Sequence, residues 1–96
     1  MLAFMRHLIL SIAVVMVASA AQAACYADYK AKRDNPLTLH YGVAEIRGAC
    51  DPDNAQAQLQ PKLAADGWTL LQVVSVFGQD GLDQRKANAG QFFLRY

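Results

Sequence analysis

The chain has 96 residues, of which 54% are apolar, and its 9 Lys and Arg residues nearly balance its 8 Asp and Glu residues. Proteins that bind nucleic acids usually carry a marked basic excess, so we expect no nucleic-acid partner. A chain of this length predicts one small domain. Such a domain buries only about 60% of its unfolded surface and is marginally stable.

The first segment has the pattern of a secretory signal peptide. A short basic start at Arg6 and His7 precedes an apolar run from Leu8 to Ala21. This run is as long as the core of a signal peptide and shorter than the roughly 20 residues that a membrane-spanning helix needs. It ends at Ala21-Gln22-Ala23, which places small residues at the first and third positions of a cleavage site.

We therefore predict that residues 1–23 are a cleaved secretory signal peptide and that residues 24–96 form a single domain. This domain is expected to be periplasmic or secreted, with no membrane span after cleavage. An uncleaved membrane anchor and a lipid attached to Cys25 are the alternatives to this interpretation.

The cysteines Cys25 and Cys50 both remain after cleavage. An oxidising compartment makes a disulfide the expected state of such a pair, and a small domain often needs this kind of staple. A redox-active pair is the alternative. Redox motifs, however, usually place their cysteines close together, as in Cys-x-x-Cys, so we predict a structural disulfide.

Two strands are expected before the helix. Residues 27–32 alternate between apolar and polar, which is the period of a half-buried strand. A short helix is the alternative, because Cys25 and Tyr29 stand four residues apart. Residues 37–46 alternate more clearly, and a change of parity after Gly42 predicts a β-bulge there.

These strands conflict with the predicted disulfide. A simple hairpin that turns at Asn35 pairs Cys25 with a residue near Glu45, and not with Cys50. The disulfide therefore requires either that the chain bends back at Gly48 or that the first segment does not pair in this way.

Residues 52–66 predict a helix. Asp51 suits the N-cap position and Pro52 the first helical position. Pro61 removes one backbone donor, which predicts a kink or two helical pieces. Gly67 is a natural C-terminal cap. The apolar residues that repeat every four positions are Ala55, Leu59 and Leu63.

Residues 68–77 are apolar on both parities, as in a strand buried on both faces. Trp68 follows the helix cap Gly67 and opens this strand, so we assign both residues structural roles and expect Trp68 to anchor the core. Residues 82–90 are polar and predict no particular element, whereas residues 91–96 alternate again and predict a last strand beside residues 68–77. The fold class is thus α+β, with a small antiparallel sheet of three or four strands packed on one helix, in strand-(strand)-helix-strand-strand order.

The stretch from Leu59 to Phe77 resembles a small bacterial family of unknown function. Members of that family carry a helix, then a Gly-Trp-x-Leu-Val-like strand, then a short last strand that ends near a basic residue, to which Phe93-Leu94-Arg95 is similar. The resemblance covers the C-terminal half of the mature chain, and this sequence departs from it at Pro61. It implies an α+β fold and no particular reaction. The residues that carry it are Leu63, Gly67, Trp68, Leu70 and Val73.

The mature chain shows no catalytic constellation. Its single histidine, His40, has no serine or cysteine motif tied to it, and nucleophilic catalysis needs a neighbouring base. Cys25, His40 and Cys50 are metal-ligand types, but they lack close ligand pairs and a disulfide would use both thiolates. We therefore predict no catalytic, cofactor-binding or metal site and no cofactor. The basic cluster of Lys30, Lys32 and Arg33 indicates a solvated strand face rather than an anion site.

These observations favour an uncharacterised exported protein that acts as a small periplasmic interaction or structural module without catalytic activity. Its partner is unknown; a second copy of the chain, in a weak homodimer through a sheet edge or aromatic face, and a protein of the cell envelope are the candidates. The alternative function is a small periplasmic ligand carrier or enzyme with a pocket between helix and sheet.

Overall fold

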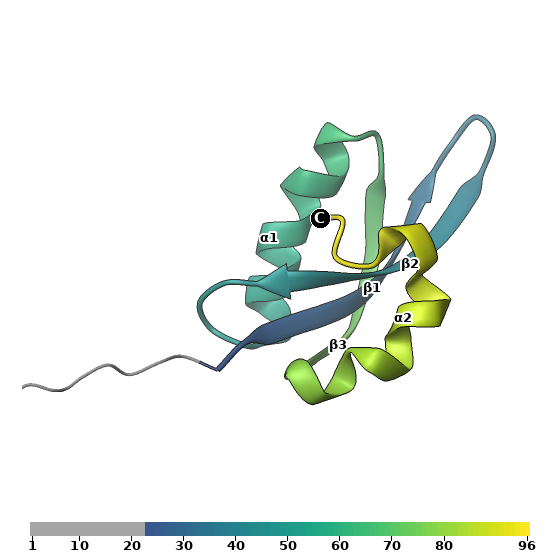
Figure 1. Cartoon of the computed structure of the whole chain (residues 1–96). Coiled ribbons are helices and arrows are strands. Elements are labelled where there is room, and N and C mark those ends of the chain that lie inside the picture. Colours follow the sequence, from purple (N-terminus) through teal and green to yellow (C-terminus); the bar gives the residue numbers. More distant parts are fainter. Residues whose placement is uncertain (1–22) are drawn as a thin grey trace, which may run out of the picture.

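The computed structural model describes residues 23–96, in which an antiparallel sheet of three strands packs on a helix (Figure 1). The α+β fold class predicted from the sequence is therefore confirmed. In chain order the elements are β1 (Cys25–Arg33), β2 (Thr38–Ile46), α1 (Pro52–Ala65), β3 (Thr69–Phe77), the 3₁₀ turn η2 (Gln79–Gly81), α2 (Asp83–Ala89) and the 3₁₀ turn η3 (Gly90–Phe92).

The signal peptide predicted over residues 1–23 lies outside the described residues except for Ala23, so its cleavage stays a prediction. Within residues 23–96, no helix has the length and apolar character needed to cross a membrane.

β1 lies in the middle of the sheet, between β2 and β3, and is antiparallel to both. The segment for which strand and helix were both open is thus a strand. Its pairing with β2 runs without a break from Cys25 opposite Ile46 to Arg33 opposite Thr38. Figure 1 shows the two strands as a long hairpin whose turn projects beyond the rest of the sheet.

Gly42 does not mark the predicted bulge, because the register between β1 and β2 has no shift. Gly42 lies opposite Tyr29, and a Cβ atom at this position would overlap the hydroxyl group and ring of that tyrosine. The glycine therefore makes room for a large side chain that is fully buried. The change of parity has another cause: both faces of β2 are covered, since Ala44 packs toward α1 and Val43 lies on the α2 side, and both are fully buried.

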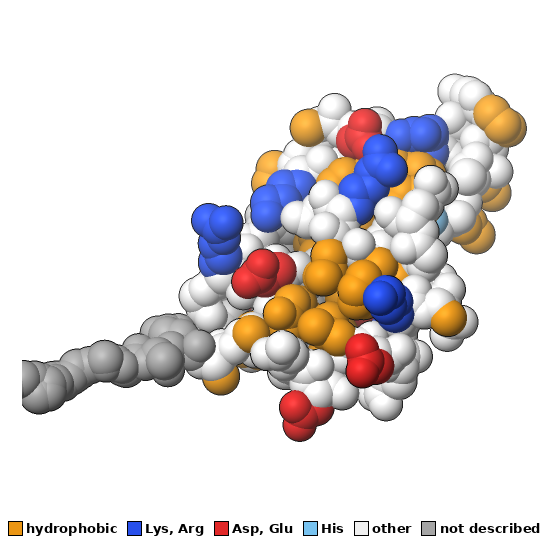
Figure 2. Space-filling view, viewed as in Figure 1, with side chains coloured by type: hydrophobic (Ala, Val, Ile, Leu, Met, Phe, Trp, Pro, Cys, Tyr) orange, Lys and Arg blue, Asp and Glu red, His pale blue; other side chains and the backbone are white. Residues whose placement is uncertain are grey.

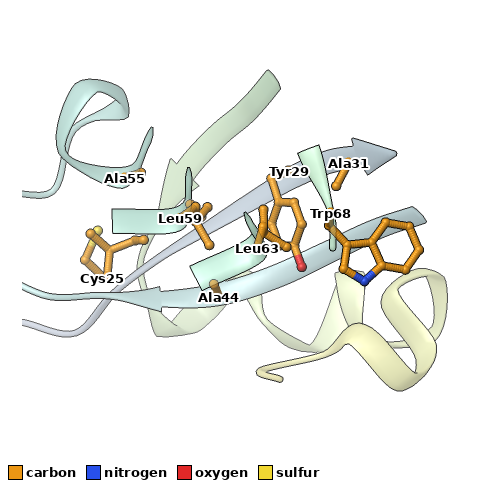
Figure 3. Close-up of a cluster of buried hydrophobic side chains, with 10 residues drawn as sticks. Cys25, Tyr29, Ala31, Ala44, Ala55, Leu59, Leu63 and Trp68 are labelled. Carbon is orange, nitrogen blue, oxygen red and sulfur yellow. The ribbon is translucent and has the colours of Figure 1, made fainter. Parts of the chain in front are cut away.

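The core lies between α1 and one face of the sheet (Figure 3). The helix contributes Ala55, Leu59 and Leu63, which are at most 1% exposed. Trp68, which was expected to anchor the core, is 5% exposed. The core residues of the strands are Cys25, Ala27, Tyr29, Ala31, Ala44 and Ile46.

The disulfide between Cys25 and Cys50 is present, with the two Cα atoms 5.7 Å apart. The hairpin pairs Cys25 with Ile46, and the chain then bends back at Gly48, which has a φ of 81°. The hairpin pairing and the disulfide are therefore compatible, because the turn at Gly48 returns Cys50 to Cys25 at the start of β1.

Loss of this bond should lower the free energy of unfolding by about 2 to 5 kcal/mol. The cysteines are 25 residues apart, and closing a loop of that length contributes about 3.5 kcal/mol in the chain-entropy model. Cys50→Ser is the cleaner variant, because Cys50 is exposed and Cys25 is buried. Urea unfolding should give the same midpoint for this variant as for the reduced wild-type protein, and a lower one than for the oxidised protein. Equal midpoints for the oxidised and reduced wild-type protein would rule out a stabilising role.

α1 begins at the predicted cap and continues through Pro61. The Asp51 side chain accepts a hydrogen bond from the Asn54 backbone N–H at 2.8 Å, and Pro52 occupies the first turn. The helix is a single element, whereas a kink or two pieces had been expected. Pro61 and Ala57, whose carbonyl loses its helical donor at the proline, are both exposed, so water can satisfy that carbonyl.

The helix ends in a Schellman motif around Gly67. Gly67 has a φ of 84° and donates its backbone N–H to the Ala64 carbonyl, while the Trp68 N–H reaches the Leu63 carbonyl at 2.9 Å. The predicted C-terminal cap is thus present, and it directs the chain straight into β3 with Trp68 against the core.

β3 is an edge strand and is not buried on both faces as expected. Its pairing with β1 has two register shifts, which leave Leu71 and Val74 as extra residues. These two are 50% and 44% exposed, whereas Leu70, Val73 and Val76 pack against the core. The bulges therefore explain why apolar residues occur on both parities, and they also disrupt an edge that could otherwise pair with another chain.

The last residues form no strand beside β3, contrary to the prediction. Phe93 makes one isolated parallel bridge with Val43, and the Leu94 N–H donates to the Val43 carbonyl at 2.8 Å, on the free side of β2. Positive φ values at Gly90 and Leu94, of 56° and 59°, break the extended run. In Figure 1 the chain passes from α2 around β2 to the α1 side. This segment therefore covers the edge of the sheet at β2 and does not add a strand beside β3. The weak homodimer through a sheet edge or aromatic face stays a prediction.

Candidate functional site

Aromatic rings gather around His40 on the α1 side of β2. Its imidazole lies parallel to the Phe92 ring, with centroids 3.7 Å apart, and meets the Trp68 ring edge-on at 4.3 Å. Nε2 shares a hydrogen bond with the Tyr29 hydroxyl at 3.0 Å. Tyr96 stacks farther away, at 6.4 Å. The only histidine of the mature chain is thus built into an aromatic cluster that joins the core to the C-terminal segment.

His40 is held neutral at pH 7. Burial, and then the positive charges of Arg33 and Arg95, lower its pKa to about 4. The side chain is 91% buried, and its Nδ1 atom has no hydrogen-bond partner within residues 23–96. A neutral imidazole can stack as an aromatic ring between Phe92 and Trp68, so its role here is structural.

The stability of the protein should therefore fall as the pH drops from about 6.5 to about 4. In that range an unfolded His40 binds a proton and the folded one does not, so acid favours the unfolded state. The loss should be about 3 kcal/mol at most, because one pKa unit corresponds to roughly 1.36 kcal/mol. His40→Phe keeps a ring in the stack and removes the titration. Chemical unfolding between pH 7 and pH 4.5 should show a smaller loss for His40→Phe than for wild type, and equal losses would contradict this explanation.

A groove of about 540 Å³ opens beside this cluster. Its walls come from the ends of β1 and β2, the junction between α1 and β3, and the C-terminal segment. Figure 2 shows Lys and Arg side chains around apolar surface in the upper part of the molecule, where α1 ends and β3 begins in Figure 1. The lining residues are Arg33, Thr38, Leu39, Asp66, Trp68, Gln91, Phe92 and Arg95.

Two contacts hold the Arg33 side chain in this groove. Its guanidinium carbon lies 4.0 Å from the centre of the Trp68 ring, a cation–π contact, and its Nη2 donates to the backbone carbonyl of Asp66. A flexible side chain is thereby ordered at the groove wall. The stretch that contains Arg33 was interpreted from sequence as a solvated strand face, but Arg33 in fact crosses to the α1–β3 junction.

Arg95 reaches the same groove from the C-terminal segment. Its Nη2 lies 4.0 Å from Oδ2 of Asp66, and its guanidinium carbon lies 5.8 Å from the centre of the Phe92 ring. Oδ2 of Asp66 also accepts a hydrogen bond from the Tyr96 hydroxyl. The groove therefore contains two guanidinium groups and one carboxylate that is already engaged.

A second polar cluster surrounds Asp28 on the opposite face of the sheet. Asp28 is 4% exposed and accepts hydrogen bonds from Ser75 Oγ at 2.7 Å, Tyr41 Oη at 2.8 Å and Arg85 Nε at 3.0 Å. Burial alone would raise the pKa of this carboxyl, but the three hydrogen bonds and the Arg85 charge outweigh burial and hold the pKa below 3.8. Since Arg85 belongs to α2, the cluster ties that helix to the sheet.

The residues considered as metal ligands are not brought together. Cys25 and Cys50 form the disulfide, and His40 lies among aromatic rings. Across residues 23–96 no group of three or more His, Cys, Asp or Glu side chains could hold a metal ion. The structure instead brings Arg33 and Arg95 together, which are far apart in the sequence and carry no motif.

No protein-family model, curated protein or solved structure matches this chain. The resemblance to a small bacterial family therefore stays a prediction. The fold and the groove define a small α+β domain with a concave surface of arginine and aromatic side chains.

Proposed function

We propose that the protein is a small exported interaction module, without catalytic activity, that binds its partner through the groove beside Trp68. One observation carries this proposal: Arg33 and Arg95 converge on a concave surface whose aromatic walls are Trp68 and Phe92. The disulfide is compatible with an exported protein, because such bonds persist in oxidising compartments.

The composition and rigidity of the groove support binding. Arginine and tryptophan are enriched among the residues that dominate binding energy at protein interfaces. The Trp68 ring is fixed by its contacts with His40 and Phe92, and Arg33 is stacked on it. A partner therefore meets side chains that lose little further conformational freedom on binding.

The alternative of a carrier with a pocket between helix and sheet receives less support. The space between α1 and the sheet is filled by Tyr29, Leu59 and Leu63, each at most 1% exposed (Figure 3). A ligand there would have to displace close-packed core side chains.

The test compares two variants with the same change of charge. Arg95→Glu reverses a charge in the groove, and Arg47→Glu does so at an exposed residue that does not line it. Wild-type protein and Arg47→Glu, immobilised and exposed to a periplasmic extract of the native host, should retain the same partner after chemical cross-linking, and Arg95→Glu should lose it. Equal capture by all three proteins, or no reproducible partner for any of them, would refute the groove as the binding surface.

A further inference from the structure

We infer that the groove takes a carboxylate carried next to an aromatic ring, an inference that rests on the proposed use of the groove for binding. Two parts of the ligand would be recognised by two parts of the site: the carboxylate by Arg33 and Arg95, and the ring by Phe92 and Leu39.

The arginines supply the carboxylate site. A guanidinium group has five N–H donors in one plane and can bind a carboxylate through two parallel hydrogen bonds. Within residues 23–96 the Arg33 guanidinium makes one hydrogen bond, to the Asp66 backbone carbonyl, so it retains donors for a ligand. Its stacking on Trp68 fixes the plane in which these donors lie.

The charge of the groove favours a singly charged anion. Arg33 and Arg95 contribute two positive charges and Asp66 one negative charge, and the Asp66 carboxylate is engaged by Tyr96 and Arg95. The excess is one positive charge, which a carboxylate neutralises. A phosphate group, which carries close to two negative charges at neutral pH, would add repulsion with Asp66.

The aromatic walls provide the second half of the site. The Trp68 and Phe92 rings meet at 79° with centroids 5.6 Å apart, and Leu39, 64% exposed, adds apolar surface to the same groove. A ligand ring can pack against Phe92 in an offset or edge-on arrangement and against Leu39, whereas Trp68, 5% exposed, supports the Arg33 guanidinium that is stacked on it. A volume of about 540 Å³ falls in the range typical of small-molecule sites.

Two sources can present this chemistry: a free aromatic acid, or the last residue of a partner protein that ends in Phe, Tyr or Trp. Both place a carboxylate within a few bonds of a ring. The experiment therefore needs one probe for each source and a neutral analogue of each probe.

Trp68 provides the readout, because it is the single tryptophan of the chain and lines the groove. The titrants are phenylacetate, the peptide Gly-Gly-Phe with a free C-terminus, phenylacetamide, the same peptide with an amidated C-terminus, and inorganic phosphate. At least one of the two acids should change Trp68 emission saturably, and its amide should bind at least tenfold more weakly. Binding by the peptide alone identifies a partner's C-terminus, whereas binding by phenylacetate identifies a free acid.

Variants separate the charge of the arginines from their geometry. Arg95→Gln should weaken binding at least tenfold, and it should fold because Arg95 is half exposed. Arg33→Lys keeps the charge but lacks the planar fork, so it should also weaken binding. Arg47→Gln, outside the groove, should leave the affinity unchanged.

The inference is wrong if neither acid changes Trp68 emission up to millimolar concentrations, if the amides bind as well as the acids, if phosphate binds more tightly than both, or if Arg95→Gln has no effect. Its failure can be told apart from that of the proposed function. If Arg95→Glu loses a captured protein but neither acid binds, the groove binds a partner protein and the inferred ligand class is wrong. If phenylacetate binds but no protein is captured, the inferred ligand class is right and the proposed function as an interaction module is wrong.

Discussion

Trp68→Ala should lower the free energy of unfolding by about 3 to 5 kcal/mol, the usual cost of truncating a large buried aromatic side chain. Trp68 is 5% exposed and joins three parts of the molecule. Its ring contacts His40 of β2, Phe92 of the C-terminal segment and the guanidinium of Arg33. Removing it therefore leaves a cavity where these parts meet.

Urea unfolding followed by far-UV circular dichroism measures this effect, because the variant has lost its only tryptophan fluorophore. Trp68→Phe should cost less, since it keeps a ring in the cavity. Leu37→Ala is a matched control: Leu37 is also apolar but 66% exposed, so its truncation should change stability by no more than about 0.5 kcal/mol. If Trp68→Ala kept the wild-type stability and lost only a ligand, Trp68 would be a binding platform and not a core anchor.

The features that could be predicted from sequence depend on neighbouring residues. The Asp51-Pro52 start of α1, the Gly67 cap and the four-residue spacing of Leu59 and Leu63 all follow from local rules, and each is present in the structure. The disulfide could be predicted because the sequence has the pattern of an exported protein and just two cysteines, which leave one pairing. The residues that Trp68 contacts could not be predicted from local rules.

The C-terminal segment shows where local patterns fail. Phe92, Leu94 and Tyr96 alternate as in a strand, but a stacking contact between Phe92 and His40 and the positive φ values at Gly90 and Leu94 determine the path of the chain. The contact partner of Phe92 is more than 50 residues away in the sequence. Since no local pattern encodes such a contact, alternation was misinterpreted as a strand.

The groove was missed for the same reason. Arg33 and Arg95 line the same groove only because the C-terminal segment passes around β2 to the end of α1. In the sequence Arg33 belongs to a basic cluster with Lys30 and Lys32, whereas Arg95 is a single basic residue between Leu94 and Tyr96. The bulges at Leu71 and Val74 were likewise hidden, because an apolar extra residue in an edge strand has the same pattern as a strand buried on both faces.

Arg85→Ala should lower the free energy of unfolding by about 3 kcal/mol, because removing one partner of a buried ion pair leaves the other charge uncompensated. Arg85 donates from Nε to the Asp28 carboxylate at 3.0 Å and from Nη1 to the Gly81 carbonyl at 2.7 Å, and it stacks over the Phe77 ring. Asp28, 4% exposed, would keep only the hydrogen bonds from Ser75 and Tyr41. Lys86→Ala, at an exposed position of the same helix, is the matched control and should change stability little.

The pH dependence identifies the origin of the loss. The pKa of folded Asp28 lies below 3.8, so its stabilising contribution is present above the unfolded value and is lost as the pH falls through the folded value. Without Arg85 the pKa of Asp28 should rise toward or above its unfolded value, so Arg85→Ala should lose less unfolding free energy than wild type as the pH falls through the acid range. Identical acid profiles for the two proteins would show that the loss comes from packing against Phe77 and not from the charge.

Replacing Arg85 should also weaken binding at the groove, which lies on the other face of the sheet. Asp28 and Arg85 tie α2 to the sheet, and α2 leads through η3 directly to Phe92, which stacks on His40 and lines the groove. Loosening α2 should therefore increase amide hydrogen exchange in residues 83–93 and weaken binding at the groove, although Arg85 does not line it. Faster exchange confined to α2, with unchanged affinity at the groove, would show that the stack of Phe92 on His40 holds the groove without help from the helix.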